Sequence, residues 1–400
     1  MGIFETPYFH NNKRFIILLG QWPFLSPIRQ HSARCIVTVL ITSILMPKLI
    51  KFIEVIDDID GIIECVPMIG LHFASLTKFF NWIINSKKMK HLLIRIEQDW
   101  RNIKFNEDLK IMHKFYERGR VLTMAYAIVT MFSILGLYLA SPSVPKFLDI
   151  IYPLNQSRDR IYLYQTEYFV DQDEYYIPIL IHAYMTVPVS LCVIVFVDNM
   201  FAMYIHHACG LFAALRLHLE SIHITINDNE NSEDQSERYD EIYQKIVMCI
   251  KMHKNVLEFF NELESSGSIS YLIILMINLS MITVTAIVTV MKIDQPSESI
   301  RFLAFTIGVI FHIFFSCFMG QKLIDESSVI FHAVYGFEWY SIPMNLQSLA
   351  IPIMIRSKNP CRLTAGKMIT LSMDTFSLVM LSNQAQQLTE QSESVLFTSM

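Results

Sequence analysis

Charged residues are scarce in this sequence, and the scarcity limits what kind of protein it encodes. Lys, Arg, Asp and Glu make up 17% of the 400 residues, whereas a soluble globular domain carries about 25%. Hydrophobic residues reach 52%, with only 12 Gly and 14 Pro, and the net charge is −5. These values exclude an ordinary soluble domain and a basic nucleic-acid-binding protein, and they favour a polytopic membrane protein.

The chain also lacks the motifs of enzymes. It has no HExxH, no nucleophile elbow and no phosphate-binding glycine loop, and its seven Cys include no CxxC pair. We therefore expect no enzymatic activity and no cofactor. His206, His207 and Cys209 are close enough on a helix to hold a metal ion. Because nothing else gathers around them, packing and hydrogen bonding are the favoured interpretation.

Long uncharged runs are the main feature that is present. A helix needs roughly 20 largely apolar residues to cross the hydrocarbon core of a membrane. Four runs meet this requirement, at 121–145, 175–197, 265–291 and 302–321. Two weaker runs, 35–53 and 62–85, carry charges near their ends, where these can reach the interface. With a last apolar stretch from Thr364, the sequence predicts an all-α membrane protein of seven transmembrane helices.

The short loops predict the orientation of these helices. Basic residues precede the first span, the next loop is acidic, and residues 86–120 hold ten basic against five acidic residues. This alternation predicts a cytoplasmic N-terminus and, after seven spans, an extracellular C-terminus. Asn155 begins the one N-x-S/T sequon outside a predicted span, and its loop is predicted to lie outside, so it is a candidate glycosylation site.

The hydrophobic pattern also divides the chain into segments. Apolar stripes at helical spacing in 208–222 and 241–263 predict that the fourth and fifth helices continue into the cytoplasm and pack together. The expected segments are a cytoplasmic N-terminal segment (1–34), transmembrane helices one to four (35–207), a cytoplasmic loop with helix extensions (208–268), transmembrane helices five and six (269–321), a second cytoplasmic segment (322–363), a last helix (364–390) and a polar tail (391–400).

Polar and aromatic side chains in the outer halves of the spans are candidate ligand-binding residues. Polar groups inside a membrane are costly and often functional. Bundled helices would enclose an aromatic, Met-lined cavity that opens outward and suits a small apolar ligand. For each residue alone, helix packing is at least as good an interpretation. The candidates are His72, Phe73, Phe132, Ser133, Tyr138, Tyr176, His182, Tyr184, Met185, Phe302, Phe305 and Thr306.

Several short motifs resemble one known family. LTAGK at 363–367 followed by LSMDTF at 371–376 resembles the C-terminal signature of insect odorant receptors. LGQWP at 19–23 and HACGLF at 207–212 are similar to further elements, as are Tyr335, Trp339 and Pro360 before the last helix. The T-Y and Q-F ending of the related gustatory receptors is absent, which favours the odorant branch.

The resemblance implies a ligand-tuning subunit, rather than the co-receptor, of a nonselective cation channel gated by small volatile ligands. Family members form a heterotetramer with a conserved co-receptor in the plasma membrane, here expected in the dendrite of an olfactory sensory neuron. The resemblance also implies a pocket in the outer halves of spans 2, 3, 4 and 6, a cytoplasmic anchor where subunits meet, and a pore along the last helix. The implied pore residues are Ser372, Asp374, Thr375, Phe376 and Val379.

Other functions remain open at this stage. A G-protein-coupled receptor would require an extracellular N-terminus, and a gustatory-type receptor channel would share the expected topology. An ion-coupled transporter would require broken helices or repeats, which the sequence does not display. Asp374 itself has three interpretations: a pore-lining charge, a buried partner of Lys367, or a residue held near water at the cytoplasmic boundary.

The end of the chain departs from the family pattern. Family members continue with an apolar, aromatic-rich stretch, whereas residues 383–390 read NQAQQLTE. Polar side chains facing lipid are costly. Two interpretations follow: an altered terminus that leaves a weak or inactive subunit, or a short pore helix whose polar end lies in a water-filled vestibule.

Epitope tags on the two ends test the predicted orientation. We expect a C-terminal tag to be stained by antibody on intact cells and an N-terminal tag only after permeabilisation, because the basic loops hold the N-terminus in the cytoplasm. Staining of the N-terminal tag on intact cells would contradict this topology and favour the G-protein-coupled alternative.

Overall fold

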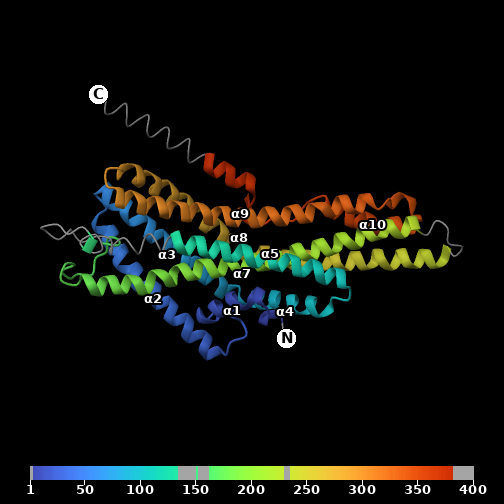
Figure 1. The fold of residues 1–400 in the computed structure, drawn as a ribbon, viewed down its shortest axis with the longest axis horizontal. Coiled ribbons are helices and arrows are strands. Elements are labelled where there is room, and N and C mark those ends of the chain that lie inside the picture. Colours follow the sequence, from blue (N-terminus) through green and yellow to red (C-terminus); the bar gives the residue numbers. More distant parts are fainter. Residues whose placement is uncertain (1–2, 134–149, 152–161, 229–234, 382–400) are drawn as a thin grey trace, which may run out of the picture.

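The structure, a computed structural model, describes residues 3–133, 150–151, 162–228 and 235–381. The chain forms an elongated bundle whose long helices run roughly along its longest dimension (Figure 1). The helices are α1 (Pro7–Leu18), α2 (Pro27–Glu54), α3 (Ile59–Ile84), α4 (Ser86–Asn102), α5 (Asn106–Met131), α7 (Tyr176–Asp228), α8 (Gln235–Met291), α9 (Pro296–Gly336) and α10 (Met344–Ser357), with 3-10 turns at Ile3–Glu5 and Trp339–Ser341. Strands β1 (Thr364–Ala365) and β2 (Ile369–Thr370) form an antiparallel hairpin, and residues 373–381 are again helical.

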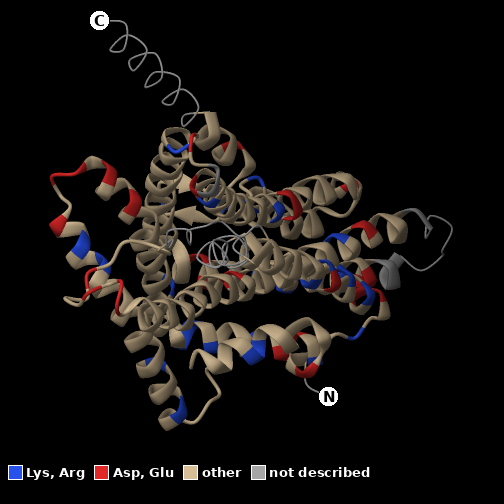
Figure 2. Cartoon of the chain, turned by 60° about the vertical axis from the view of Figure 1, so that its left-hand side comes forward, with Lys and Arg blue, Asp and Glu red and all other residues tan. Residues whose placement is uncertain are grey.

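Five of the described helices are long and apolar enough to cross a membrane, namely α2, α3, α7, α8 and α9. They contain predicted spans 1, 2, 4, 5 and 6. The third predicted span begins on α5 and runs on into residues outside the described part. Charged residues gather mostly near helix ends and in connecting segments, with long uncharged stretches between them (Figure 2). The chain is thus a polytopic all-α membrane protein.

Two helices are far longer than a membrane is thick. α7 has 53 residues and α8 has 57, so each is about 80 Å long at 1.5 Å per residue, against a hydrocarbon core of about 30 Å. They continue past their apolar spans as the helical stripes predicted, and they pack against each other. We refer to the opposite end of the bundle, where α8 ends and α9 begins, as the predicted outer end.

α7 is the central helix of the bundle. It packs against α1, α2, α3, α5, α8 and α9, and its residues 193–210 are all buried. A helix surrounded on every side needs a sequence that is apolar or hydrogen-bonded all round. In the run VIVFVDNMFAMYIHHACG, apolar residues fill most positions, and Asp198 and His207 form hydrogen bonds with residues of neighbouring helices.

The last element begins later than expected. The sequence predicted a helix from Thr364, but residues 364–370 form the hairpin, and Gly366 and Lys367 in its turn both have positive φ. A left-handed turn ends any regular helix, and glycine supplies it at little cost. Gly366 N–H donates to the Ser268 carbonyl at 2.8 Å, which fastens the turn to α8. Apolar spacing alone did not reveal this turn.

A buried charge network joins five helices in the middle of the bundle. Lys78 on α3 forms an ion pair with Asp198 on α7, and the two side chains are only 5% and 7% exposed. His312 Nε2 on α9 lies 3.1 Å from Asp198 Oδ2, and Tyr126 on α5 donates to the same oxygen at 2.9 Å. Asn278 on α8 lies 3.1 Å from His312 Nδ1. The network therefore fixes the relative positions of α3, α5, α7, α8 and α9.

Removing Asp198 should destabilise the fold strongly. The variant Asp198→Leu leaves Lys78 buried without a counter-charge, a loss that costs about 3–5 kcal/mol in soluble proteins. We expect a large drop in the melting temperature of the detergent-solubilised protein, and partial recovery in the double variant Lys78→Met/Asp198→Leu. Glu220→Gln is the control, because its ion pair with Arg216 is about half exposed and such pairs contribute about 0–1 kcal/mol. Equal melting temperatures for Asp198→Leu and Glu220→Gln would contradict the structural role of the network.

Candidate functional site

Most of the predicted ligand-binding residues point into the bundle. Six of the twelve are buried, and two are partly buried. Because these residues come from α3, α7, α9 and the end of α5, the helices that were expected to form a pocket do surround a common interior. Tyr138 lies outside the described residues, as does the predicted glycosylation site Asn155. The buried residues are His72, Ser133, Tyr176, Phe302, Phe305 and Thr306, and the partly buried ones are His182 and Tyr184.

Three predicted residues are not brought into this interior. Phe73, Phe132 and Met185 have 42%, 67% and 61% of their surface exposed. Phe73 lines an apolar groove of about 520 Å³ on the outside of α2, α3 and α8. Adjacent residues on a helix point about 100° apart. The candidates were selected only by their depth in the span, so they include both the inward-facing His72 and the outward-facing Phe73.

A buried polar chain crosses from α2 to α7 through His72. Lys48 Nζ lies 2.9 Å from His72 Nε2, and Ser190 Oγ lies 2.8 Å from His72 Nδ1. The Lys48 ammonium also lies 3.6 Å from the ring centroid of Tyr164, which belongs to the segment before α7. Each nitrogen of the His72 ring thus has a partner, as buried polar groups require.

A second chain passes through His182 on α7. Tyr168 Oη lies 2.8 Å from His182 Nδ1, and Ser43 Oγ on α2 lies 2.9 Å from His182 Nε2. Burial raises the pKa of Tyr168 to about 12, so its phenol stays protonated at neutral pH and can donate to the histidine. The predicted outer end therefore holds two neighbouring sets of hydrogen-bonding groups between α2 and α7.

The α9 residues occupy the other side of the interior. Phe302 and Phe305 are buried, and the Arg301 guanidinium lies 5.0 Å from the Phe302 ring centroid. Thr306 Oγ1 lies 2.7 Å from Thr285 Oγ1, which links α9 to α8. These contacts hold the outer half of α9 against its neighbour.

A cavity between these helices is very small. A cavity bounded by α3, α5, α7, α8 and α9 has a volume of only about 20 Å³, room for about one water molecule. Its lining residues are Leu71, Ala74, Thr130, Leu191, Ile194, Asn278, Met281, Gly308, Val309 and His312. A ligand with several carbon atoms would enter this cavity only if the surrounding side chains moved apart.

A larger polar pocket of about 440 Å³ lies at the predicted outer end, above this cavity. Its cations are paired: Lys292 with Glu64 at 3.0 Å, and Arg301 with Glu298. Small-molecule pockets have volumes of about 300–1,000 Å³, so this pocket has room for a small ligand. It is lined by Lys51, Glu64, Tyr162, Tyr164, Gln165, Thr166, Gln172, Lys292, Gln295, Glu298 and Arg301.

The predicted pore residues form the start of the last helix. Ser372 is buried and caps the helix, because its Oγ accepts a hydrogen bond from Thr375 N–H at 3.3 Å. Phe376 packs edge-on against Phe314 of α9, with ring centroids 5.5 Å apart, and Val379 is partly buried. Asp374 is exposed in the single chain and, among the described residues, forms no ion pair with Lys367. Its place in the first turn is favoured by the helix dipole.

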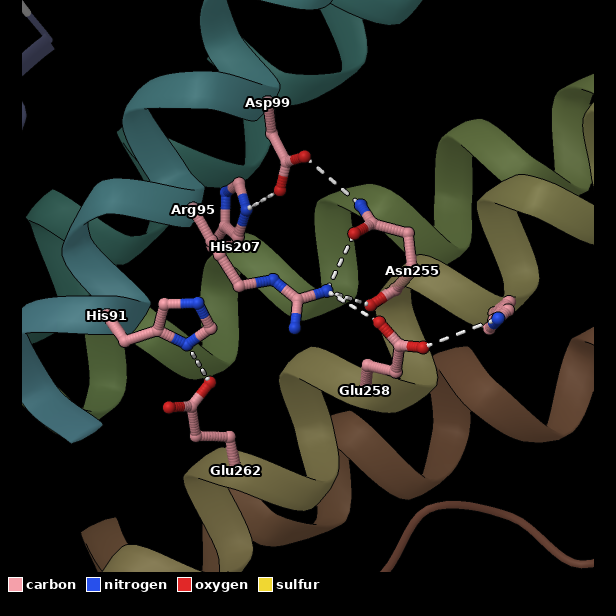
Figure 3. A network of polar contacts seen from close by, with 8 residues as sticks. His91, Arg95, Asp99, His207, Asn255, Glu258 and Glu262 are labelled. Carbon is pink, nitrogen blue, oxygen red and sulfur yellow. Dashed lines mark hydrogen bonds and ion pairs between the residues drawn. The ribbon is translucent and has the colours of Figure 1, made fainter.

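A polar network on the predicted cytoplasmic side accounts for one of the histidines that were considered as metal ligands (Figure 3). His207 Nε2 lies 3.0 Å from Asp99 Oδ2. Outside the view of the figure, His207 Nδ1 lies 2.9 Å from Tyr116 Oη. Asn255 donates to Asp99 at 3.1 Å and accepts from Arg95 at 2.7 Å. The network joins α4 to α7 and α8.

Exposed contacts surround this network. His91 lies 2.6 Å from Glu262, and Arg95 lies 3.7 Å from Glu258. Cys209 donates its thiol proton to the Lys322 carbonyl rather than facing the histidines. Within the described residues, no three His, Cys, Asp or Glu side chains are grouped as metal ligands.

Sequence reasoning missed the buried charges. Lys48 and Lys78 are among the charges that were expected to reach the interface from helix ends, Asp198 directly follows a predicted span, and His312 lies inside another. A signal was present, because each is an ionisable residue inside or beside an apolar run. Their pairing depends on the order of the helices in space, which one sequence does not give.

The 7tm odorant receptor family model matches residues 58–382, well over half of the chain. The chain belongs to the 7tm odorant receptor family. The match covers the helices that carry the candidate pocket and the start of the last helix, and it confirms the resemblance seen in the short motifs.

Individual odorant receptors are distant relatives. The chain is 23% identical over 168 residues to Odorant receptor 85f of Drosophila melanogaster, covering 42% of this chain and 41% of that one. It is 24% identical over 263 residues to Odorant receptor 43b of the same fly, covering 64% and 61%. The aligned regions thus span less than two thirds of the length of these relatives.

A solved odorant-receptor structure has the same fold. The insect olfactory receptor OR5 from Machilis hrabei, in complex with eugenol, superposes with a TM-score of 0.76 over 96% of this chain and 100% of that one. The sequence identity is 14%, so the similarity concerns the fold.

Gly320 on α9 offers a test of the contact with the last helix. A Cβ at this position would lie 2.1 Å from the Leu371 carbonyl oxygen, and overpacking of this kind costs about 1–3 kcal/mol. We expect Gly320→Ala to lower the melting temperature in detergent and the amount of protein at the cell surface. Gly336→Ala on the same helix is the matched control, since nothing lies within 4 Å of its added methyl. Equal stability of the two variants would contradict the close approach.

Proposed function

We propose that the chain is the ligand-tuning subunit of an odorant-gated, nonselective cation channel that it forms with a co-receptor. The carrying observation is that the helices of the expected pocket, α3, α5, α7 and α9, surround an interior toward which six of the predicted ligand residues are buried. Membership of the odorant receptor family supports the same role. We also propose the plasma membrane of the olfactory sensory neuron dendrite as its location.

The proposed ligand is a small volatile organic molecule. The cavity between these helices is lined mainly by apolar side chains with a few polar groups, and the outer pocket of about 440 Å³ has the volume of a small-molecule site. OR5 of Machilis hrabei was solved with eugenol, a small aromatic molecule, and we infer a ligand of comparable size for this chain. His72, His182 and Thr306 are the polar candidates for orienting it.

The proposed coupling between ligand and pore runs along α9. Its outer half carries Phe302, Phe305 and Thr306, and its inner half contacts the start of the last helix through Phe314 and Gly320. A ligand that binds better when α9 is displaced would shift the population toward a displaced last helix. In the proposed heterotetramer, this helix lines the pore, and residues 322–363 belong to the cytoplasmic anchor between subunits.

Co-expression tests this function directly. We expect odorant-evoked cation current in cells that express both this chain and the co-receptor, because the pore is proposed to need last helices from both subunits. Cells with the co-receptor alone provide the baseline. Odorant-evoked current from this chain alone would contradict the required pairing, and a broad odorant panel without any current from the pair would contradict the channel function.

The polar ending can be tested in the same cells. A chain in which residues 382–400 are replaced by an apolar, aromatic-rich ending should give current whether the original ending is functional or not. Current from both chains would rule out the interpretation of an inactive terminus, and current from the replaced chain only would support it.

A further inference from the structure

Lys48 is a buried basic residue to which the described part of the chain supplies no acid. Its side chain on α2 is only 1% exposed. Its nearest polar partners are His72 Nε2 at 2.9 Å and the face of the Tyr164 ring at 3.6 Å, neither of which is an anion. No Asp or Glu among the described residues forms an ion pair with it.

The neighbouring cations differ in this respect. Lys51, one turn further out on α2, pairs with Glu54 at 3.1 Å. The other two cations of the outer pocket, Lys292 and Arg301, have carboxylate partners as well. Even the deeper Lys78 is neutralised by Asp198. The unpaired state of Lys48 is therefore not a general property of lysines in this chain.

The surroundings of Lys48 favour an incoming anion. His72 Nε2 on α3 lies 2.9 Å from Lys48 Nζ, and Ser190 is on the other nitrogen of the ring. His182, with Tyr168, lies on the facing side of α7. These groups are neutral or hydrogen-bond donors. A buried amine without an anionic partner is poorly stabilised as a cation, and a carboxylic acid that transfers its proton to this amine would form a charge-assisted hydrogen bond with it.

Tyr164 separates Lys48 from the outer pocket. Its ring covers the Lys48 ammonium and also lines the 440 Å³ pocket at the predicted outer end. Lys48 lies six residues before the end of α2 at Glu54, which corresponds to a depth of about 9 Å. A rotation of the Tyr164 side chain would open a short path from the pocket to the ammonium.

We propose that Lys48 binds the carboxylate of the ligand, so that the ligand class of this chain is small carboxylic acids. The acid would enter through the outer pocket, displace the Tyr164 ring and pair with Lys48, while His72 holds the lysine in place. This proposal deepens the proposed function and rests on it only for the gating readout. The ligand would thus give Lys48 the carboxylate partner that the described residues around it do not provide.

Matched ligands test the proposal on the co-expressed channel. Hexanoic, octanoic, benzoic and phenylacetic acids are compared with the aldehyde, alcohol and methyl ester of the same carbon skeleton. We expect at least one acid to act at about tenfold to a hundredfold lower concentration than its neutral analogues, as a charge-assisted hydrogen bond would give. A channel that opens to the neutral compounds and prefers no acid overturns the proposal.

Two lysine variants locate the effect. Lys48→Met should remove the preference for the acid and keep responses to neutral analogues. Lys110→Met on α5 removes a cation that already pairs with Glu107 at 2.7 Å and that does not line the outer pocket, so it should keep the preference. Loss of the preference in Lys110→Met but not in Lys48→Met would overturn the assignment of Lys48.

A binding readout separates this proposal from the channel function. The melting temperature of the purified, detergent-solubilised chain is measured with each acid and with its primary amide. Stabilisation by an acid, absent with the amide and lost in Lys48→Met, supports the ligand class even if the pair gives no current. Current from the pair without any such stabilisation or acid preference leaves the channel function intact and rejects the ligand class.

Discussion

The ion pair between Lys78 and Asp198 is the constraint on which the membrane bundle depends. Two opposite charges in a low-dielectric interior are tolerable only when they stay together, so α3 and α7 cannot slide past each other without separating them. His312 and Tyr126 add α9 and α5 to the same carboxylate. The surrounding contacts are apolar and non-directional, so they would allow several relative positions of the helices. The network selects one register among them.

That network positions α9, and α9 connects the network to the outer residues of the bundle and to the last helix. His312 lies between the outer residues Phe302–Thr306 and the inner residues that contact the last helix. At Gly320 the backbone of α9 comes so close to Leu371 that a single methyl group would not fit. The helix is thus held at its centre and tightly packed at its inner end, while its outer part borders the nearly filled cavity.

Much of the architecture could be predicted from the sequence, because membrane spans are set by composition and length. The apolar runs located α2, α3, α7, α8 and α9, and apolar stripes predicted the extensions of α7 and α8. The hairpin before the last helix escaped notice, since it depends on positive φ at Gly366 and Lys367 rather than on hydrophobicity. Within the site, depth in the span was predictable but helix rotation was not, so Phe73 was grouped with His72. The partners of Lys48 and Asp198 required the arrangement of helices in space.

The small volume of the cavity between α3, α5, α7, α8 and α9 has a kinetic consequence for any ligand that binds there. A ligand cannot simply arrive in a cavity of about 20 Å³; the side chains of several helices must first move apart. Association that waits for such a rearrangement is slower than diffusion allows. At high ligand concentration the delay before a response would then stop shortening and settle at the opening rate of the bundle itself. The response time would then be a property of the chain itself. The packing between α3, α7 and α9 would set the fastest change in ligand concentration that the chain can follow.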